Sequence, residues 1–348
     1  MALIINIVVF IITLSILILI HEFGHFFAAR RFHIKVERFA IGLGKPLWRS
    51  RGTARRARTE YTFSPFLFGG YVKLNDDSYN QAPIWQRLII MISGVGANIL
   101  LAALLMWLVL SIGITLPKPI IGQVLPNSIA ARAGLPANTQ ITNIDGRKVK
   151  NWQQVNIAII TRLGDKGIMT INRYALNLTT WQVDKLKPDP LLGLGIIPYL
   201  PPKPDKWPAK MLYLHQYPVH QALPQALFDI GIILKFNYII LAKLLTGKIS
   251  IFVLGGPITI FTVTAYAFAE GILVFLSFIA LLSVMLAFVN ILPLPGLDGG
   301  NCLLLLYEAI RRKPLSAKIT FTIWRIGMLV IATLIFIAVG NDLLRLFL

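Results

Sequence analysis

The sequence of 348 residues is poor in cysteine and in acidic residues. Its one cysteine, Cys302, excludes an internal disulfide and a zinc site built from several thiolates, and we expect it to be a small buried residue. Asp and Glu number 15 against 34 Lys and Arg, and only 14% of residues are charged, against about 25% in an average soluble domain. This composition indicates a membrane protein rather than a soluble one.

Long stretches without charge are the main feature of what remains. Ala2 to Ile20 carries no charged residue, and no Lys or Arg precedes this run, which argues against a cleaved signal peptide. Further apolar runs near the length that a spanning helix needs, about 20 residues, begin near Leu88, Leu273 and Phe321. The sequence therefore predicts a polytopic α-helical membrane protein with a four-span core.

The net charge of +19 raises the question of nucleic acid, but no aromatic-interleaved basic module accompanies it. We expect no nucleic-acid partner and attribute the excess to the lipid bilayer. Basic residues crowd the segment after the first span: Arg30, Arg31, Lys35, Arg38, Lys45, Arg49, Arg51, Arg55, Arg56 and Arg58. The positive-inside rule makes this segment cytoplasmic and the N-terminus extracytoplasmic.

The first span contains the sequence His-Glu-Phe-Gly-His at positions 21–25. Residues four apart share a helix face, so His21 and His25 can bind one metal ion while Glu22 reaches a water molecule beside it. Ionisable residues inside a membrane are costly and usually functional. We therefore expect a metal centre here; the alternatives are a chance match and a polar cluster that only joins helices.

Residues 1–116 form the first predicted region, and two of its features are open to two interpretations. A membrane-associated β-hairpin region is expected over residues 37–74, either as an ordinary hairpin or with an edge strand that pairs with an extended substrate. That strand would contain Gly70, Tyr71, Val72 and Lys73. In the second span, Gly94 and Asn98 share a helix face, which either only permits close packing or also aims the Asn98 amide at the metal centre.

Residues 117–199 are more polar, contain short alternating strands, and resemble one extracytoplasmic PDZ domain, a small α/β fold. The Ala-Gly-Leu step at 133–135 and the Ile-Asp-Gly turn at 144–146 carry that resemblance, with a helix expected over Trp152 to Leu163. Such domains bind a peptide as an added strand. Residues 200–270 follow as a Pro-rich linker and interfacial amphipathic helices, among them Leu227 to Leu245.

Residues 271–348 hold the last two predicted spans, and the first of these runs into a segment rich in Pro and Gly, Asn290 to Gly300. Irregular backbone at membrane depth is tolerated only where it is buried in protein or lines a wet cavity, and Asp298 is the one acid there. If Leu227 to Phe268 makes no net crossing, the third span ends on the cytoplasmic side and brings Asp298 to the leaflet of His25. Two histidines and one carboxylate are typical of a hydrolytic zinc site; the alternative for Asp298 is a helix cap or turn.

Together these motifs resemble the bacterial site-2 protease family of intramembrane zinc metalloproteases, in particular the regulator of sigma-E protease group. The motifs are His-Glu-Phe-Gly-His, Phe-Gly-Gly-Tyr-Val-Lys-Leu at 68–74, Gly-x-x-x-Asn at 94–98, the PDZ-like segment, and Asn-x-x-Pro-x-Pro-x-Leu-Asp-Gly at 290–299. The resemblance implies that His21, His25 and Asp298 bind Zn²⁺ and that Glu22 is catalytic. The residues expected to contact substrate are Asn290, Gly70, Tyr71, Val72, Lys73 and Asn98.

The resemblance also implies a substrate class and a location. The substrates are transmembrane segments of single-span proteins, such as anti-sigma factors or remnant signal peptides, unwound before cleavage. The location is the bacterial cytoplasmic (inner) membrane, with both termini and the PDZ-like domain outside and the active site near the cytoplasmic side. The chain departs from the family pattern in three ways. It has room for one PDZ domain, whereas longer relatives carry two. In addition, Asn301 stands where His is expected, and Val95 stands where Pro is common.

Two other classes of function remain open. One is a non-catalytic, zinc-containing membrane scaffold that uses its PDZ domain for binding, against which the intact Glu22 argues. The other is an ion or proton transporter, since His and Glu inside membranes also form relays. The lack of an inverted repeat between the two halves weighs against a transporter.

Overall fold

The computed structural model describes residues 1–51, 59–182, 189–201 and 207–347. The chain divides into two compact units. The first comprises Met1–Val109, Ala222–Leu234 and Thr259–Ile335, and the second comprises Leu110–Gln221, Lys235–Ile258 and Phe336–Leu348. Three of the basic residues assigned to the cytoplasmic loop, Arg55, Arg56 and Arg58, lie outside the described residues, as do positions 183–188 of the PDZ-like segment and 202–206 of the linker.

Five described helical segments are long and apolar enough to cross a membrane. Four of them match the predicted spans: α1 (Ala2–Arg31), α3 (Ile84–Ile112), α9 (Ile272–Ile291) and α11 (Ala317–Phe347). The fifth, Ile251–Ala269, combines the short turn η3 (Ile251–Val253) with α8 (Pro257–Ala269). At 1.5 Å per residue α8 alone rises about 20 Å, less than the ~30 Å of a hydrocarbon core. The absence of a net crossing by this segment stays a prediction.

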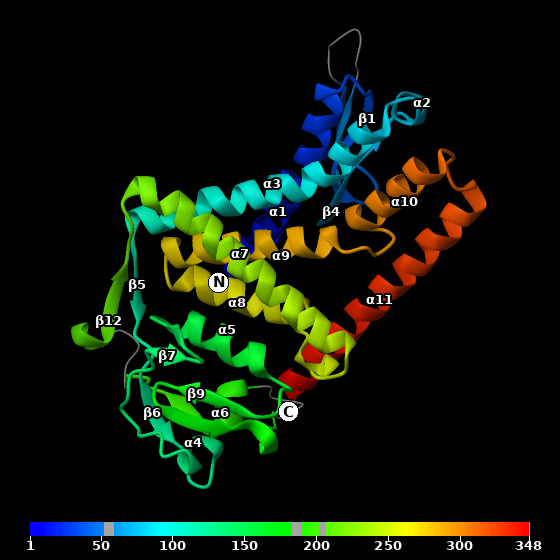
Figure 1. Ribbon diagram of the computed structural model, residues 1–348. Helices are drawn as coiled ribbons and strands as arrows, with labels where there is room; N and C mark the ends of the chain where they lie inside the picture. The colour runs from blue at the N-terminus through cyan, green and yellow to red at the C-terminus, as the bar shows by residue number, and fades with distance from the viewer. Residues whose placement is uncertain (52–58, 183–188, 202–206, 348) are drawn as a thin grey trace. The chain divides into compact units, whose positions relative to one another are not determined.

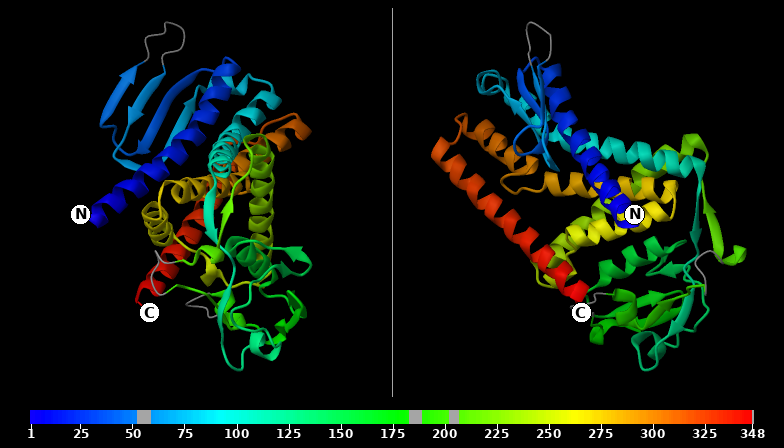
Figure 2. Two further views of the ribbon diagram at one scale, coloured as in Figure 1. Left: turned by 90° about the vertical axis from the view of Figure 1, so that its left-hand side faces the viewer. Right: turned by 180° about the vertical axis from the view of Figure 1, so that it is seen from behind.

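The predicted hairpin region is a larger, mixed sheet of four strands in the first unit, and it lies against the C-terminal part of α1 (Figures 1 and 2). Its strands are β1 (Val36–Leu43), β2 (Trp48–Arg51), β3 (Glu60–Phe63) and β4 (Phe66–Leu74). Their order is β2-β3-β1-β4, with β1 and β3 parallel and the other neighbours antiparallel. β4 is therefore an edge strand of this sheet. The short helix α2 (Asp76–Asn80) follows it, capped by the Asn75 side chain.

The helix α7 (Val219–Leu245) differs in part from the interfacial amphipathic helix that the sequence predicts. Within the first unit, one side of α7 packs on the spans α3 and α9 through a buried apolar cluster of Ala102, Ala103, Ile230, Ile233, Ala280 and Val284. The opposite side exposes Leu227 and Phe228, which are 52% and 63% accessible. This part of α7 has no polar outer face, because it packs against protein on one side and presents apolar side chains on the other.

The second unit contains the elements expected of the PDZ-like segment. A sheet of order β10-β9-β7-β8 is formed by β7 (Asn143–Ile144), β8 (Arg147–Lys148), β9 (Ile168–Ile171) and β10 (Tyr174–Asn177). Asp145 and Gly146 have positive φ angles and make the β7–β8 turn. Two further strand pairs are β6 (Ile121–Val124) with β11 (Ile196–Pro198), and β5 (Ile114–Pro117) with β12 (Leu212–His215).

Helices complete this unit and close its core. The helix expected over Trp152 to Leu163 is α5 (Trp152–Arg162), which Asn151 caps; α4 (Ile129–Arg132) and α6 (Pro190–Leu194) are shorter. The core consists of fully buried aliphatic side chains from strands and helices, among them Ile121, Ile144, Ile159, Met169 and Ile196. Near the end of α5, Asp165 pairs with Lys243, a buried residue of α7 whose Nζ lies 2.8 Å from Asp165 Oδ1.

Candidate metal centre and active site

The two histidines of the first span lie on one face of α1, as their spacing predicts. His21 and His25 are buried, and their rings meet edge to face with centroids 4.8 Å apart. Phe23 and Phe27, on the other side of the same turns, are 50% and 63% exposed. The helix thus presents an apolar surface on one side and holds two imidazoles inside the protein on the other.

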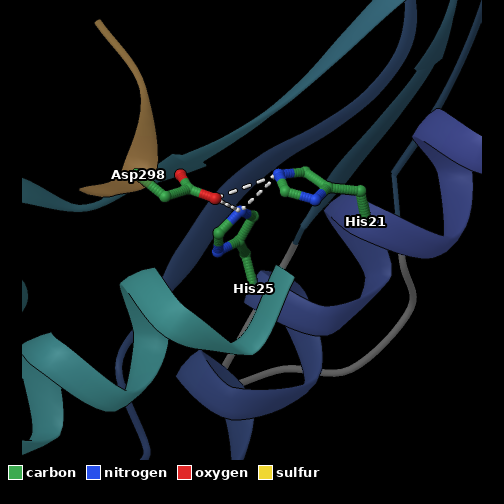
Figure 3. A group of neighbouring side chains, drawn as sticks. All are labelled: His21, His25 and Asp298. Atoms are coloured by element: carbon green, nitrogen blue, oxygen red, sulfur yellow. Dashed lines mark hydrogen bonds and ion pairs between the residues drawn. The ribbon is translucent and has the colours of Figure 1, made fainter. Parts of the chain in front are cut away.

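Asp298 reaches these histidines from the other end of the chain, at the first residue of α10 (Asp298–Arg311). Its Oδ2 atom lies 3.1 Å from His21 Nε2 and 3.4 Å from His25 Nε2, and the two Nε2 atoms are 3.2 Å apart (Figure 3). Two adjacent glycines make this approach possible. A Cβ on Gly299 would lie 2.2 Å from the Ile291 carbonyl oxygen, and one on Gly300 would lie 2.2 Å from that of Leu294.

The three side chains fit a metal ion. Asp298 Oδ2 is buried and has no hydrogen bond, although it faces two imidazole nitrogens. The ligand atoms of the group all lie within 4.8 Å of one another. Ligands around a tetrahedral zinc ion, each about 2.0–2.2 Å from it, are about 3.4 Å apart, close to the separations seen here. A set of two nitrogens and one oxygen suits zinc and leaves a fourth position for water or substrate.

Contacts from α3 orient both imidazoles. His25 Nδ1 lies 2.7 Å from the Ile90 carbonyl oxygen, so Nδ1 carries the proton and Nε2 keeps its lone pair. His21 Nδ1 lies 3.2 Å from the Asn98 amide nitrogen, while Asn98 Oδ1 is buried without a partner. A half-turn of this amide lets Oδ1 accept the Nδ1–H that a metal-binding His21 carries. The structure thus places Asn98 behind His21, fully buried.

Glycines allow α1 and α3 to approach closely at the site. A Cβ on Gly94 would lie 2.4 Å from His25 Nε2 and 2.8 Å from His21 Cε1. A Cβ on Gly24 would lie 2.3 Å from the Ser93 carbonyl oxygen. The structure therefore contains both features proposed for the Gly-x-x-x-Asn motif. Gly94 permits close packing of the two helices, and Asn98 contacts a histidine of the site.

Glu22 lies between the histidines and the edge strand β4. Its carboxylate interacts electrostatically with His21, His25 and Asp298 and lies in reach of the Val72 backbone N–H. A Cβ on Gly70 would lie 3.2 Å from Glu22 Cγ and 2.9 Å from the Ala40 carbonyl oxygen, so only glycine lets the strand pass this close.

The side chains of β4 alternate between the α1 side and the opposite side of the sheet. Tyr71 and Lys73 point away from α1: Tyr71 accepts a hydrogen bond from Arg38, and Lys73 Nζ lies 2.9 Å from Glu37 Oε2. What β4 offers beside the site is therefore its backbone rather than these side chains. Asn290 is half-buried in the last turn of α9, and its contact with substrate stays a prediction.

Residues 9–334 match the sequence profile of peptidase family M50. The chain belongs to peptidase family M50. It is 30% identical to "Protease RseP" of Yersinia pestis over 97% of this chain and 98% of that protein. It is 29% identical to a "Putative zinc metalloprotease" of Vibrio cholerae and 28% identical to "Regulator of sigma-E protease RseP" of Escherichia coli, again over at least 97% of both chains. This M50 chain is a metalloprotease and a multi-pass membrane protein.

Two contacts of the M50 site were not predicted from the sequence. The Ser283 hydroxyl on α9 donates a hydrogen bond to the Asn98 carbonyl oxygen at 2.8 Å, which joins α9 to α3 at the residue behind His21. Arg87 on α3 forms two hydrogen bonds with Glu308 on α10. The position of Arg87 near the start of an apolar helix could have indicated this second contact, because a charged residue there is costly and usually has a partner or a function.

Proposed function

We propose that this M50 chain is an intramembrane zinc endopeptidase that cleaves unwound transmembrane segments of single-span proteins. The observation that carries the proposal is that His21 and His25, in the apolar helix α1, meet Asp298, which follows His21 by 277 positions, at one enclosed point. Two of the relatives are named as a putative zinc metalloprotease and as a regulator of sigma-E protease. Anti-sigma factors and remnant signal peptides are therefore the substrate classes that we favour.

Each residue of the site has a role in this proposal. The two histidines and Asp298 would hold a zinc ion, which would supply Lewis-acid chemistry for polarising a peptide carbonyl and activating water at neutral pH. Glu22 takes a proton from the attacking water and passes it to the leaving nitrogen. The closeness of Glu22 to Gly70 on β4 supports this role, because a substrate strand added beside β4 lies next to the base.

Substrate binding through backbone pairing follows from the edge position of β4. A helical substrate keeps its carbonyls in hydrogen bonds to residues four further along, so it must unwind before cleavage. Pairing with Gly70 to Lys73 replaces the lost bonds, which matters because unsatisfied groups in lipid cost several kcal/mol. Asn290, at the end of α9, would hold the same substrate chain.

The proposed location is the bacterial cytoplasmic membrane, with both termini and the PDZ-like domain outside and the metal centre near the cytoplasmic face. The basic residues after α1 and the loop between α10 and α11, with Arg311, Arg312 and Lys313, support this orientation. The PDZ-like domain would bind or filter substrate chains outside. We propose a single such domain in this chain, because the roughly 80 residues of 117–199 leave room for only one.

The test is cleavage of a tagged single-span reporter by purified wild type and by Glu22→Gln, with zinc measured on both. We expect wild type alone to cleave and both proteins to contain similar zinc, because Glu22 is a base and not a ligand. Zinc without cleavage of several trimmed reporters would favour a scaffold. Absence of both zinc and cleavage would favour a transporter.

A further inference from the structure

One face of α3 contacts both histidines of the metal centre although α3 contributes no metal ligand. Arg87, Ile90, Gly94 and Asn98 follow one another at spacings of three, four and four residues, which places them on one side of a helix. Asn98 contacts His21, the Ile90 carbonyl contacts His25, and Gly94 leaves room for both rings. The contacts with the histidines account for three of these residues but do not explain the function of Arg87.

Among the described residues of the first unit, Arg87 forms the most enclosed ion pair between an arginine or lysine and a carboxylate. Its Nη1 and Nη2 atoms lie 2.8 and 3.0 Å from the two carboxylate oxygens of Glu308, and the two side chains are only 9% and 18% exposed. The Tyr79 ring of α2 covers the guanidinium at 4.9 Å. A two-pronged contact of this kind fixes orientation as well as distance.

Glu308 lies in the last turns of the helix that begins with Asp298. The segment before α10, Leu292–Leu297, is irregular, so chain continuity with α9 alone does not fix the direction of α10. Two contacts do. At the N-terminal end the glycines 299 and 300 press against the carbonyls of residues 291–294, and at the other end Glu308 is held by Arg87. A helix fixed at both ends also fixes the carboxylate at its start.

We propose that Arg87 and Glu308 are positioning residues for the metal centre. Their ion pair holds α10 on α3 in the orientation that brings Asp298 Oδ2 to the two histidine nitrogens. The proposal rests on the proposed function, because it requires Asp298 to bind metal. An ion pair that only stabilises the fold would behave differently. Its loss would lower the stability of the protein without changing its affinity for zinc.

The experiment measures zinc release to a chelator, together with the melting temperature, for the full-length protein in detergent. The variants are Glu308→Gln and Arg87→Lys, the second of which keeps the charge but loses the two-pronged geometry. Lys243→Gln is the matched control, because it breaks another buried ion pair, with Asp165, in the second unit. We expect zinc affinity to fall about 10- to 100-fold in both Arg87 and Glu308 variants, as for residues that orient metal ligands, and to stay unchanged in the control.

Zinc affinity within twofold of wild type in both Arg87→Lys and Glu308→Gln would overturn the inference, whatever their melting temperatures. Equal losses of zinc affinity in these variants and in Lys243→Gln would also overturn it, because the effect would then follow general destabilisation. A wild-type protein that binds no zinc would overturn the proposed function itself. If wild type binds zinc and cleaves the reporter normally while the variants keep their zinc affinity, only the positioning role of Arg87 and Glu308 would be overturned.

Discussion

At the scale of single residues, the site depends on side chains that are absent as much as on those that are present. Gly94 faces both imidazoles, and any Cβ there would lie 2.4 Å from His25 Nε2. Gly96, two positions further on the same helix, has open space where a Cβ would be. The two glycines of the second span therefore have different roles, which the motif alone does not reveal.

Gly94→Ala is expected to abolish zinc binding and cleavage, because the added methyl would lie 2.4 Å from His25 Nε2 and so displace the metal-facing imidazole. Gly96→Ala is the control: it adds the same group in open space and gains up to about 1 kcal/mol of helix propensity. Zinc content and reporter cleavage of both variants provide the measurement. Normal zinc content in Gly94→Ala would contradict the position assigned to the site.

Asn98 offers a second test at this scale. If it accepts the Nδ1 proton of His21, Asn98→Asp should keep zinc affinity, because a carboxylate accepts the same bond, whereas Asn98→Leu should lower it about 10- to 100-fold. Chelator competition gives both values. If instead both variants bind zinc normally and only KM rises, Asn98 contacts substrate, as the family resemblance implies.

At the scale of elements, the sequence predicts local geometry well but only part of the long-range pairing. His21 and His25 follow from helical spacing, and Asp298 follows from counting membrane crossings and from the broken segment before it. The ion pair of Arg87 and Glu308 joins residues 221 positions apart, and nothing in either local segment names its partner. Likewise, the parallel pairing of β1 with β3 could not be predicted, because short strands of similar composition can be arranged in several strand orders within a sheet.

The edge strand β4 leads to a prediction about substrates. Cleavage requires exchange of helical hydrogen bonds for bonds to β4, so Gly or Pro near the cleaved bond should raise the rate. Replacement of those residues by Leu or Ala should lower it, because both favour the helix. Initial rates on a matched reporter series provide the measurement, with reporter binding measured as the control. Equal rates across the series would contradict the unwinding step.

At the scale of the whole molecule, the orientation in the membrane can be tested with the chain's one cysteine. Cys302 is buried, and Cys302→Ala provides a background without thiols. In this background, Arg147→Cys on β8 should react in intact cells with a maleimide that cannot cross the cytoplasmic membrane. Lys313→Cys should react only after lysis, because the basic loop after α10 is cytoplasmic. The reverse labelling would contradict the proposed topology.

The central claim is that α1 and α10 together hold one zinc ion through His21, His25 and Asp298. X-ray absorption at the zinc edge on the purified protein tests it most directly, with Asp298→Asn for comparison. We predict two imidazole nitrogens and a carboxylate oxygen at about 2.0–2.2 Å, with no sulfur, and an altered oxygen shell or lost zinc in the variant. A sulfur ligand, a single imidazole, or an unchanged spectrum in Asp298→Asn would contradict the account.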